Sequence, residues 1–220
     1  MVKVIKLICG DALEELKNIP ENYVDLILTD PPYNTKNIGP NKREYSWGIM
    51  QLSKEDYISF CKVWFQEAYR ISKNIVFTPG IANICNYPQP FWVLCWHKPA
   101  AVSYNRMGGY NAWEPIFIYG RAKKRIGQDY IKFNTLNLKK GPEREHPCPK
   151  PLDLIKWIII HFSDEGNLVL DPFIGFGTTG VACKMLNRKF IGIEINHEYI
   201  EMARRRIEDT FYEPTLELGE

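Results

Sequence analysis

The stretch VDLILTDPPYN, residues 24–34, constrains the fold more than any other part of the chain. Its apolar half, Val24–Leu28, has the length and composition of a buried strand. Pro31 and Pro32 then end that strand, because proline fixes φ near about −65° and has no backbone N–H to donate to a neighbouring strand. In an open α/β sheet, ligands bind at the carboxyl ends of the strands. The chain therefore places a carboxylate, a carbonyl without a ladder partner and an aromatic ring at such an end.

Asp30, the carbonyl of Pro31 and the ring of Tyr33 together suit one task, which is to accept hydrogen bonds from a planar amino group while the ring stacks on the heterocycle that carries it. The alternative is a strand that ends in a proline turn with a surface aspartate. Asp-Pro-Pro alone favours this alternative, whereas Tyr33 and the motifs farther along the chain favour the amino-group site.

Strand-like runs alternate with helical periods along the whole chain, which predicts an α/β fold with a mostly parallel sheet covered by helices on both faces. The expected strands are Val4–Ile8, Val24–Thr29, Asn74–Thr78, Phe91–Trp96, Pro115–Tyr119, Leu168–Leu170 and Phe190–Ile195. The fourth and fifth are joined by a loop with glycine and asparagine, and they are predicted to form an antiparallel pair. At 220 residues, the chain is expected to form one domain, 1–220.

Composition places the chain among soluble globular proteins, with 45% hydrophobic and 25% charged residues. No apolar run approaches the roughly 18–20 residues of a membrane span. The N-terminal sequence MVKVIKLICGDALEEL becomes acidic too early for a secretory signal. The six cysteines are widely spaced and most lie in apolar runs, so they are expected to be reduced and buried, without a metal site. These features predict a cytoplasmic protein without a membrane partner.

The positive charge of the chain is concentrated in residues 121–150, which hold nine lysines and arginines against three acidic residues. This segment has a net charge of +6 in a chain whose total is +2. A local basic band is typical of a polyanion-binding face, and a solvated loop explains the charge alone equally well. Residues 35–51 and 121–145 are both predicted to be irregular, and they are the candidates for contact with such a partner.

Residues 168–195 predict a second ligand site, built from a strand, a glycine-rich turn, a helix and another strand. Gly175 and Gly177 allow the backbone to approach a ligand closely, and the helix that follows presents free N–H groups to an anion. The hydroxyls of Thr178 and Thr179 add donors, and Glu194 is placed to accept both hydroxyls of a ribose. This combination predicts a nucleoside site with a carboxylate or phosphate at its far end.

The same turn matches the pattern G-x-G-x-x-G through Gly175, Gly177 and Gly180, so a nicotinamide dehydrogenase has to be weighed. That pattern is weak by itself. Two observations oppose it: the unit lies near the C-terminal end of the chain with no catalytic domain after it, and a dehydrogenase does not explain Asp-Pro-Pro-Tyr.

Taken together, the motifs resemble those of the S-adenosylmethionine-dependent DNA amino-methyltransferases, which methylate adenine N6 or cytosine N4. The resemblance is carried by Asp30-Pro31-Pro32-Tyr33, Asp171-Pro172-Phe173-x-Gly175-x-Gly177, Cys9-Gly10-Asp11 and His146-Pro147-x-x-Lys150-Pro151. Their order, with the catalytic motif before the cofactor motif, resembles the β group of the family. Weaker likeness occurs at Trp96-His97-Lys98-Pro99 and Trp113-Glu114. The departures are Phe176, where the family often has serine, and Cys148-Pro149, where it often has threonine and glutamine.

The resemblance implies a Rossmann-like fold with a seven-stranded, mostly parallel sheet, one antiparallel strand and helices on both faces. By starting residue, the implied strand order is Val4, Phe190, Leu168, Val24, Asn74, Pro115, Phe91. The implied reaction is direct transfer of a methyl group from S-adenosyl-L-methionine to an exocyclic amino nitrogen of a base flipped out of double-stranded DNA. A homodimer is compatible with this reaction.

Each motif residue receives a role from the resemblance. Asp30 and the Pro31 carbonyl accept the two N–H bonds of the target amino group, Pro32 completes the catalytic motif, and Tyr33 stacks on the base. The implied cofactor-binding residues are Asp11 at the adenine amino group, Glu194 at the ribose and, around the methionine end, Lys150, Asp171, Pro172, Phe173, Gly175, Gly177, Thr178 and Thr179. The expected DNA contacts, from segments thought to flank the cleft, are Asn34, Lys123, Arg125, Lys139 and Lys140.

Three other functions are weighed against an adenine-N6 methyltransferase. Members that methylate cytosine N4 more often carry serine at the position of Asp30, so N4-cytosine is the alternative within the family. A nucleic-acid-binding subunit that needs a partner for its specificity is an alternative of another class. Pro147-Cys148 resembles the nucleophile of enzymes that methylate cytosine carbon 5, but those enzymes lack Asp-Pro-Pro-Tyr.

Overall fold

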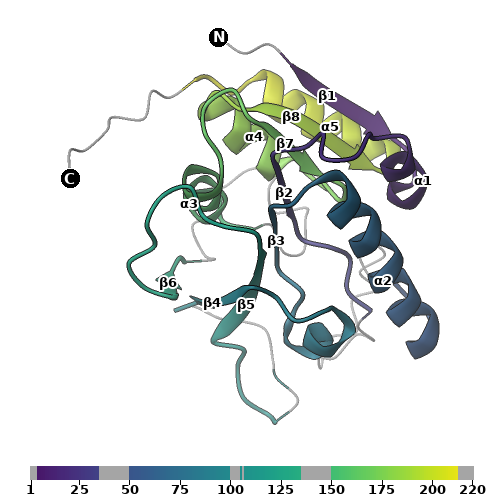
Figure 1. Cartoon of the computed structure of the whole chain (residues 1–220), viewed down its shortest axis with the longest axis vertical. Coiled ribbons are helices and arrows are strands. Elements are labelled where there is room, and N and C mark those ends of the chain that lie inside the picture. The colour runs from purple at the N-terminus through teal and green to yellow at the C-terminus, as the bar shows by residue number, and fades with distance from the viewer. Residues whose placement is uncertain (1–3, 35–49, 100–104, 106, 135–149, 213–220) are drawn as a thin grey trace.

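The computed structural model describes residues 4–34, 50–99, 105, 107–134 and 150–212. These residues form an eight-stranded sheet with the order β1-β8-β7-β2-β3-β5-β4-β6 (Figure 1). The strands are β1 (Ile5–Cys9), β2 (Leu26–Thr29), β3 (Ile75–Phe77), β4 (Trp92–His97), β5 (Trp113–Tyr119), β6 (Tyr130–Lys132), β7 (Leu168–Asp171) and β8 (Lys189–Glu194). Neighbours pair in parallel except at β5, which is antiparallel to both β3 and β4.

The expected strand order is confirmed along the first seven positions of this sheet, and β5 is the single antiparallel strand. The eighth strand, β6, corrects the expectation that 121–145 is irregular throughout. It pairs with the outer side of β4, where Cys95 lies opposite Tyr130 and His97 lies opposite Lys132. A strand of three residues has no periodicity to detect, so only its contact with β4 defines it.

Helices cover both faces of the sheet (Figure 1). The helices α3 (Leu152–Phe162), α4 (Thr178–Met185) and α5 (His197–Glu208) pack on one face, and α1 (Ala12–Lys17) and α2 (Lys54–Ile71) pack on the other. A 3₁₀ helix, η1 (Ile81–Asn86), follows β3. Every residue of β2 and β3 is buried, because these central strands are covered on both sides. Burial on both faces explains why β2 is a continuous apolar run in the sequence rather than an alternating one.

The helices α1 and α2 each begin at a residue whose side chain caps the helix. The carboxylate of Asp11 accepts hydrogen bonds from the backbone N–H groups of Leu13 and Glu14, at 2.7 and 3.4 Å. Ser53 Oγ accepts from the backbone N–H of Asp56 at 3.0 Å. These caps fix where α1 and α2 begin, because they satisfy N–H groups that have no partner within the helix.

The cysteines are less buried than expected. Cys61 and Cys183 are buried, whereas Cys9 and Cys85 are exposed, so the expectation that most are buried is wrong. Cys148 lies outside the described residues. None of the helices in the described part of the chain is both long and apolar enough to cross a membrane.

The sheet has two unlike edges, which are called here the carboxyl edge, where the parallel strands end, and the amino edge, where they begin. Asp30 follows the last residue of β2 and therefore lies at the carboxyl edge, as do Asp171 at the end of β7 and Glu194 at the end of β8. Because β5 runs in the opposite direction, it ends at the amino edge. There the backbone N–H of Arg121 donates to the side chain of Asn74, just before β3, at 3.1 Å.

Candidate active site

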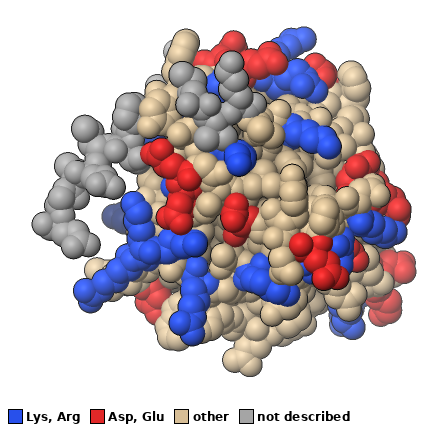
Figure 2. All heavy atoms as spheres, turned by 45° about the horizontal axis from the view of Figure 1, so that its top comes forward, with Lys and Arg blue, Asp and Glu red and all other residues tan. Residues whose placement is uncertain are grey.

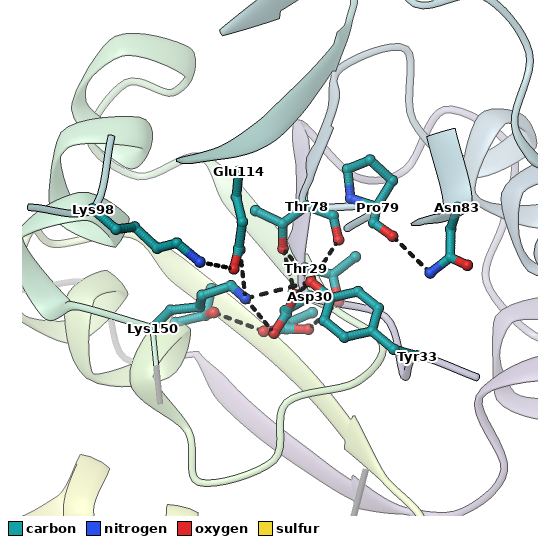
Figure 3. Close-up of polar contacts among 11 residues, drawn as sticks. Thr29, Asp30, Tyr33, Thr78, Pro79, Asn83, Lys98, Glu114 and Lys150 are labelled. Atoms are coloured by element: carbon teal, nitrogen blue, oxygen red, sulfur yellow. Dashed lines mark hydrogen bonds and ion pairs between the residues drawn. The ribbon is translucent and has the colours of Figure 1, made fainter. Parts of the chain in front are cut away.

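Asp30 lies at the carboxyl edge with hydrogen bonds on both oxygens of its carboxylate (Figure 3). Its Oδ1 accepts from the hydroxyls of Tyr33 and Thr78. Its Oδ2 lies 2.8 Å from the ammonium of Lys150. The Asp30 side chain is nevertheless 32% exposed, so these contacts hold it in place without closing it off from solvent. Asp30 is therefore an oriented anionic acceptor at the edge of the sheet where ligands bind.

Tyr33 contacts the site through its hydroxyl. This hydroxyl donates to Asp30 and lies 3.0 Å from the carbonyl oxygen of Thr78. Burial, together with the charge of Asp30, raises the pKa of Tyr33 well above its usual value, so the hydroxyl stays protonated and remains a donor. A Cβ added at Gly80 would lie 3.3 Å from the Tyr33 ring, so the absence of a side chain at Gly80 leaves room for that ring. Stacking of Tyr33 on a base stays a prediction.

Lys150 lies at the catalytic motif, whereas the resemblance placed it near the methionine end of the cofactor. Its ammonium lies between two carboxylates, 2.8 Å from Asp30 and 3.4 Å from Glu114. Burial lowers the pKa of Lys150, but the charges of Asp30 and then Glu114 outweigh that effect and raise the pKa well above its usual value. A permanently charged ammonium is therefore part of this site.

Three residues of the site are missing from the prediction: Thr78, Lys98 and Glu114. Glu114 on β5 forms an ion pair with Lys98, which follows β4 (Figure 3). Burial raises the pKa of Glu114, but the charges of Lys150 and Lys98 outweigh it and hold the pKa below its usual value. The weak resemblance to the family around Lys98 and Glu114 is a signal that could have identified both as site residues. Thr78 carries no such signal, because a threonine at the end of a strand is common.

Glu194 holds the glycine-rich turn between β7 and α4, a contact that the sequence does not predict, and its expected role at ribose hydroxyls stays a prediction. Glu194 Oε2 accepts from the backbone N–H of Gly175 at 3.0 Å, and Oε1 accepts from that of Asn196 at 3.0 Å. Burial raises the pKa of Glu194. Gly175 and Gly177 have φ angles of 51° and 80°, in the left-handed region that favours glycine. The turn thus brings backbone and a carboxylate together just before Thr178, the first residue of α4.

Asp171 joins this turn to the catalytic strand. Its Oδ1 accepts from the hydroxyl of Thr29 at 2.6 Å and from the N–H of Phe173 at 3.1 Å, and its Oδ2 accepts from the hydroxyl of Thr179 at 2.6 Å. Thr29 and Asp171 are 142 positions apart in the sequence. Because Thr29 directly precedes Asp30, one buried carboxylate ties together the two motifs that the sequence singles out.

Two other expected cofactor residues have a defined place. The ring of Phe173 packs against Phe60 and Trp64 of α2, with centroids 5.8 Å apart in each case, so its side chain belongs to the core. Asp11 follows β1, and the neighbouring Gly10 N–H donates to the Glu194 carbonyl at 2.9 Å. Asp11 and Glu194 therefore lie at the ends of adjacent strands.

Lys123 and Arg125 lie at the amino edge, away from Asp30. The backbone N–H of Lys123 donates to the carbonyl of His161 at 2.7 Å, and its ammonium lies 3.5 Å from Asp164. His161 is in the last turn of α3, which returns the chain to the start of β7. The expectation that this half of 121–145 flanks the catalytic cleft is therefore wrong. The physical reason is the direction of β5, which delivers the chain to the opposite edge.

Of the other expected DNA contacts, only Asn34 lies among the described residues. The side chain of Asn34 exchanges two hydrogen bonds with the backbone of Leu52, both at 3.0 Å. Lys139 and Lys140 lie outside the described residues. Figure 2 shows one face on which lysine and arginine side chains are interspersed with aspartate and glutamate side chains.

Comparison with known proteins gives a match to a family model described as DNA methylase (N6_N4_Mtase), over residues 24–78 and 90–205. Type II methyltransferase M.HpaI of Haemophilus parainfluenzae is 32% identical over 94% of this chain and 75% of its own length. DNA adenine methyltransferase YhdJ of Escherichia coli (strain K12) is 32% identical over 92% of this chain and 82% of its own length.

Two solved structures share the architecture of this chain. The complex of M1.HpyAVI with SAM superposes with a TM-score of 0.68 at 25% identity, over 93% of this chain and 99% of that one. PvuII DNA methyltransferase, named as cytosine-N4-specific, gives the same TM-score at 19% identity, over 91% of this chain and 85% of that one. The second likeness concerns the fold alone.

Proposed function

This chain belongs to the DNA methylase family, and from that premise we propose that it methylates the exocyclic N6 amino group of adenine in DNA. The observation that carries the proposal is the Asp30 carboxylate. It projects from the central strand and is oriented by Tyr33, Thr78 and Lys150 beside the carbonyl of Pro31. Those two acceptors match the two N–H bonds of a planar amino group.

Adenine is favoured over cytosine by the relatives and by the motif. A protein named DNA adenine methyltransferase is 32% identical to this chain over most of both lengths. Aspartate at the first position of the motif also resembles the adenine enzymes. The N4-cytosine enzyme with a similar structure is 19% identical, so its likeness concerns only the fold that both targets share. The product assay described below distinguishes methylation of adenine N6 from methylation of cytosine N4.

The cofactor is S-adenosyl-L-methionine, and the residues at the carboxyl edge fit it. Glu194 has one carboxylate oxygen toward Gly175 and can accept further hydrogen bonds from ribose hydroxyls. Asp11 lies at the adjacent strand end for the adenine amino group. The other proposed contacts are Pro172, Phe173 through its backbone, Gly175, Gly177 and Thr178, whereas Lys150 is paired with Asp30, and the buried Asp171 and Thr179 support the turn by bonding to each other. When bound, this cofactor supplies a methyl group on a sulfonium sulfur.

The chain itself supplies position and charge. The lone pair of an adenine amino nitrogen is delocalised into the ring, so the nitrogen is a weak nucleophile. Hydrogen bonds to Asp30 and to the Pro31 carbonyl favour a pyramidal nitrogen with its lone pair directed at the methyl group, and the carboxylate stabilises the positive charge that develops. Asp30 Oδ1 already accepts two hydrogen bonds, so Oδ2 is the oxygen placed to accept the amino proton.

Three further features belong to the same proposal. The target base has to leave the duplex to reach Asp30, and Tyr33 would then stack on it. The location is the cytoplasm, where the chromosome of a bacterial relative is found. A second copy of the chain is the candidate protein partner, and light scattering of the purified protein with and without DNA measures that directly.

Asp30→Ala tests the proposal. We expect the variant to lose at least about 10²-fold in methyl transfer, because one preorganised electrostatic contact typically contributes that much. Calorimetry should show nearly unchanged S-adenosylmethionine binding. Asp209→Ala, which changes an exposed aspartate after α5, is the control and should keep the wild-type rate.

The product is identified by digesting methylated DNA to nucleosides and weighing them by mass spectrometry. N6-methyl-2′-deoxyadenosine is the expected product. N4-methyl-2′-deoxycytidine would replace the proposed target with the alternative, and turnover by Asp30→Ala at the wild-type rate would show that another group holds the amino nitrogen.

A further inference from the structure

Four charged side chains alternate in sign along a line that ends at the catalytic carboxylate (Figure 3). Lys98 pairs with Glu114, Glu114 lies 3.4 Å from Lys150, and Lys150 lies 2.8 Å from Asp30. All but Asp30 are largely withdrawn from solvent, with 6% of Lys98, 20% of Glu114 and 12% of Lys150 exposed. Charges this poorly solvated interact more strongly than surface charges do.

Glu114 divides its carboxylate between the two lysines. Oε1 is paired with Lys98 and Oε2 faces Lys150. The Lys150 ammonium is thus shared by Oε2 of Glu114 and Oδ2 of Asp30, the oxygen that the proposed reaction needs. Two carboxylates and two ammoniums also give the group a net charge of zero, which a single neutral substitution changes.

The proposed reaction depends on the zero net charge of this group. The bond between methyl carbon and sulfur breaks and sulfur keeps its electron pair, while the lone pair of the target nitrogen forms the new carbon–nitrogen bond. Positive charge therefore moves onto the nitrogen, which then releases one N–H proton to Asp30 and from there to water. An uncompensated ammonium beside Asp30 opposes the arrival of positive charge and competes with the amino group for the same oxygen.

We propose that Glu114 is a positioning residue for methyl transfer, which shares the Lys150 ammonium with Asp30 and cancels its charge. This inference rests on the proposed function and deepens it. Lys98 is the anchor that fixes Glu114 in this role, because it occupies the carboxylate oxygen that faces away from Lys150.

Two substitutions separate this role from a purely structural one. Glu114→Gln keeps the size of the side chain and removes its charge, whereas Glu114→Asp keeps the charge and shortens the side chain. We expect the Gln variant to lose on the order of 10–100-fold in kcat at saturating DNA and cofactor, with little change in KM for the cofactor, and the Asp variant to retain more activity. If Glu114 only fills space, the ranking will be the reverse.

Charge balance gives a second, independent readout. Lys98→Met combined with Glu114→Gln returns the group to one carboxylate and one ammonium, so part of the lost kcat should return relative to Glu114→Gln alone. Rates are expressed per active site, titrated with labelled cofactor, so a loss of folded protein is not counted as a loss of rate. Glu67→Gln on α2 is the matched control, because Glu67 is 25% exposed and 2.8 Å from Arg70, and it should keep the wild-type kcat.

The outcomes also separate this inference from the proposed function. A wild-type chain that makes N6-methyladenine, with a Glu114→Gln variant at the wild-type kcat, overturns the role of Glu114 and leaves the function standing. A double variant no faster than Glu114→Gln overturns the charge-balance argument. A wild-type chain that methylates no DNA base overturns the proposed function and this inference with it.

Discussion

At the scale of single residues, two aspartates that share this site have opposite surroundings. Asp30 faces an ammonium and keeps access to solvent. Asp171 is 3% exposed and is surrounded by two hydroxyls and one backbone N–H, none of which carries a charge. The first arrangement supports an anion that can act on a ligand. The second supports a carboxyl group whose task is to connect β2 with the cofactor turn.

Asp171→Asn should change how stability depends on pH. Burial raises the pKa of Asp171 to about 6, above its ordinary value of 3.8, so the folded state holds this proton more tightly than the unfolded state does. The resulting stabilisation is complete below pH 3.8 and is lost as the pH rises through about 6. The Asn side chain does not titrate, so the Asp171→Asn variant lacks this pH-dependent stabilisation.

Urea unfolding of both proteins measures the effect. The free energy of unfolding of the wild type, relative to Asp171→Asn, should fall by on the order of 3 kcal/mol between about pH 4 and about pH 7.5. Other groups titrate alike in the two proteins and cancel in the difference. A difference that stays constant over this range contradicts the buried, proton-binding state of Asp171.

At the scale of elements, the sequence predicts what is local and misses what depends on contact. The strands at 24–29 and 168–170 are recognisable because each is a short, mainly apolar run. The three-residue strand β6 has no local signal, and the motifs that contain Lys98, Glu114 and Lys150 do not indicate that these three side chains meet. Both the strand and this meeting of side chains depend on segments that meet only after β4 and β5 have joined the sheet.

Gly177→Ala should damage the cofactor turn without unfolding the sheet. Gly177 has a φ of 80°, and a Cβ added there would lie 2.8 Å from the Cβ of Ala203 on α5. The left-handed conformation alone costs an L-residue roughly 1–2 kcal/mol, and the contact adds to it. The turn has to shift, so calorimetry should show weaker S-adenosylmethionine binding.

The matched control for this change is Gly127→Ala. A Cβ at Gly127 would meet no atom within 4 Å, so that variant should bind the cofactor like the wild type. Equal affinity in Gly177→Ala and the wild type would mean that the conformation of this turn does not set cofactor binding.

At the scale of the whole molecule, the direction of β5 separates the charged segments into two groups. Residues 121–125 lie at the amino edge, where Lys123 pairs with Asp164. Lys132, at the end of β6, lies at the carboxyl edge with His97 beside it in the sheet, because β6 is parallel to β4. In the proposed reaction, DNA with a flipped base approaches the edge that carries Asp30, so we expect a cation to contribute to DNA binding only on that side.

Lys132→Ala should therefore weaken DNA binding, whereas the pair Lys123→Ala and Arg125→Ala should not. If Lys132 contacts one phosphate, its loss should flatten the dependence of log affinity on log salt by about 0.9. The loss should be similar for all sequences, because phosphate contacts carry no base identity. Fluorescence anisotropy at several salt concentrations measures both quantities. Weakened binding in the Lys123 and Arg125 variant alone would place DNA at the amino edge.

The strand order also determines what an incomplete chain can do. β1 and β2 come early in the sequence, yet β8 and β7 lie between them in the sheet. Once the catalytic motif has been synthesised, about three-quarters of the protein has still to be made before β1 can pair with β8. A premature stop codon between Tyr33 and Glu194 therefore yields a chain that carries Asp30 but has no completed sheet beside it. Such alleles should behave genetically as complete losses of the gene, with no partial activity that marks the host DNA at the wrong time.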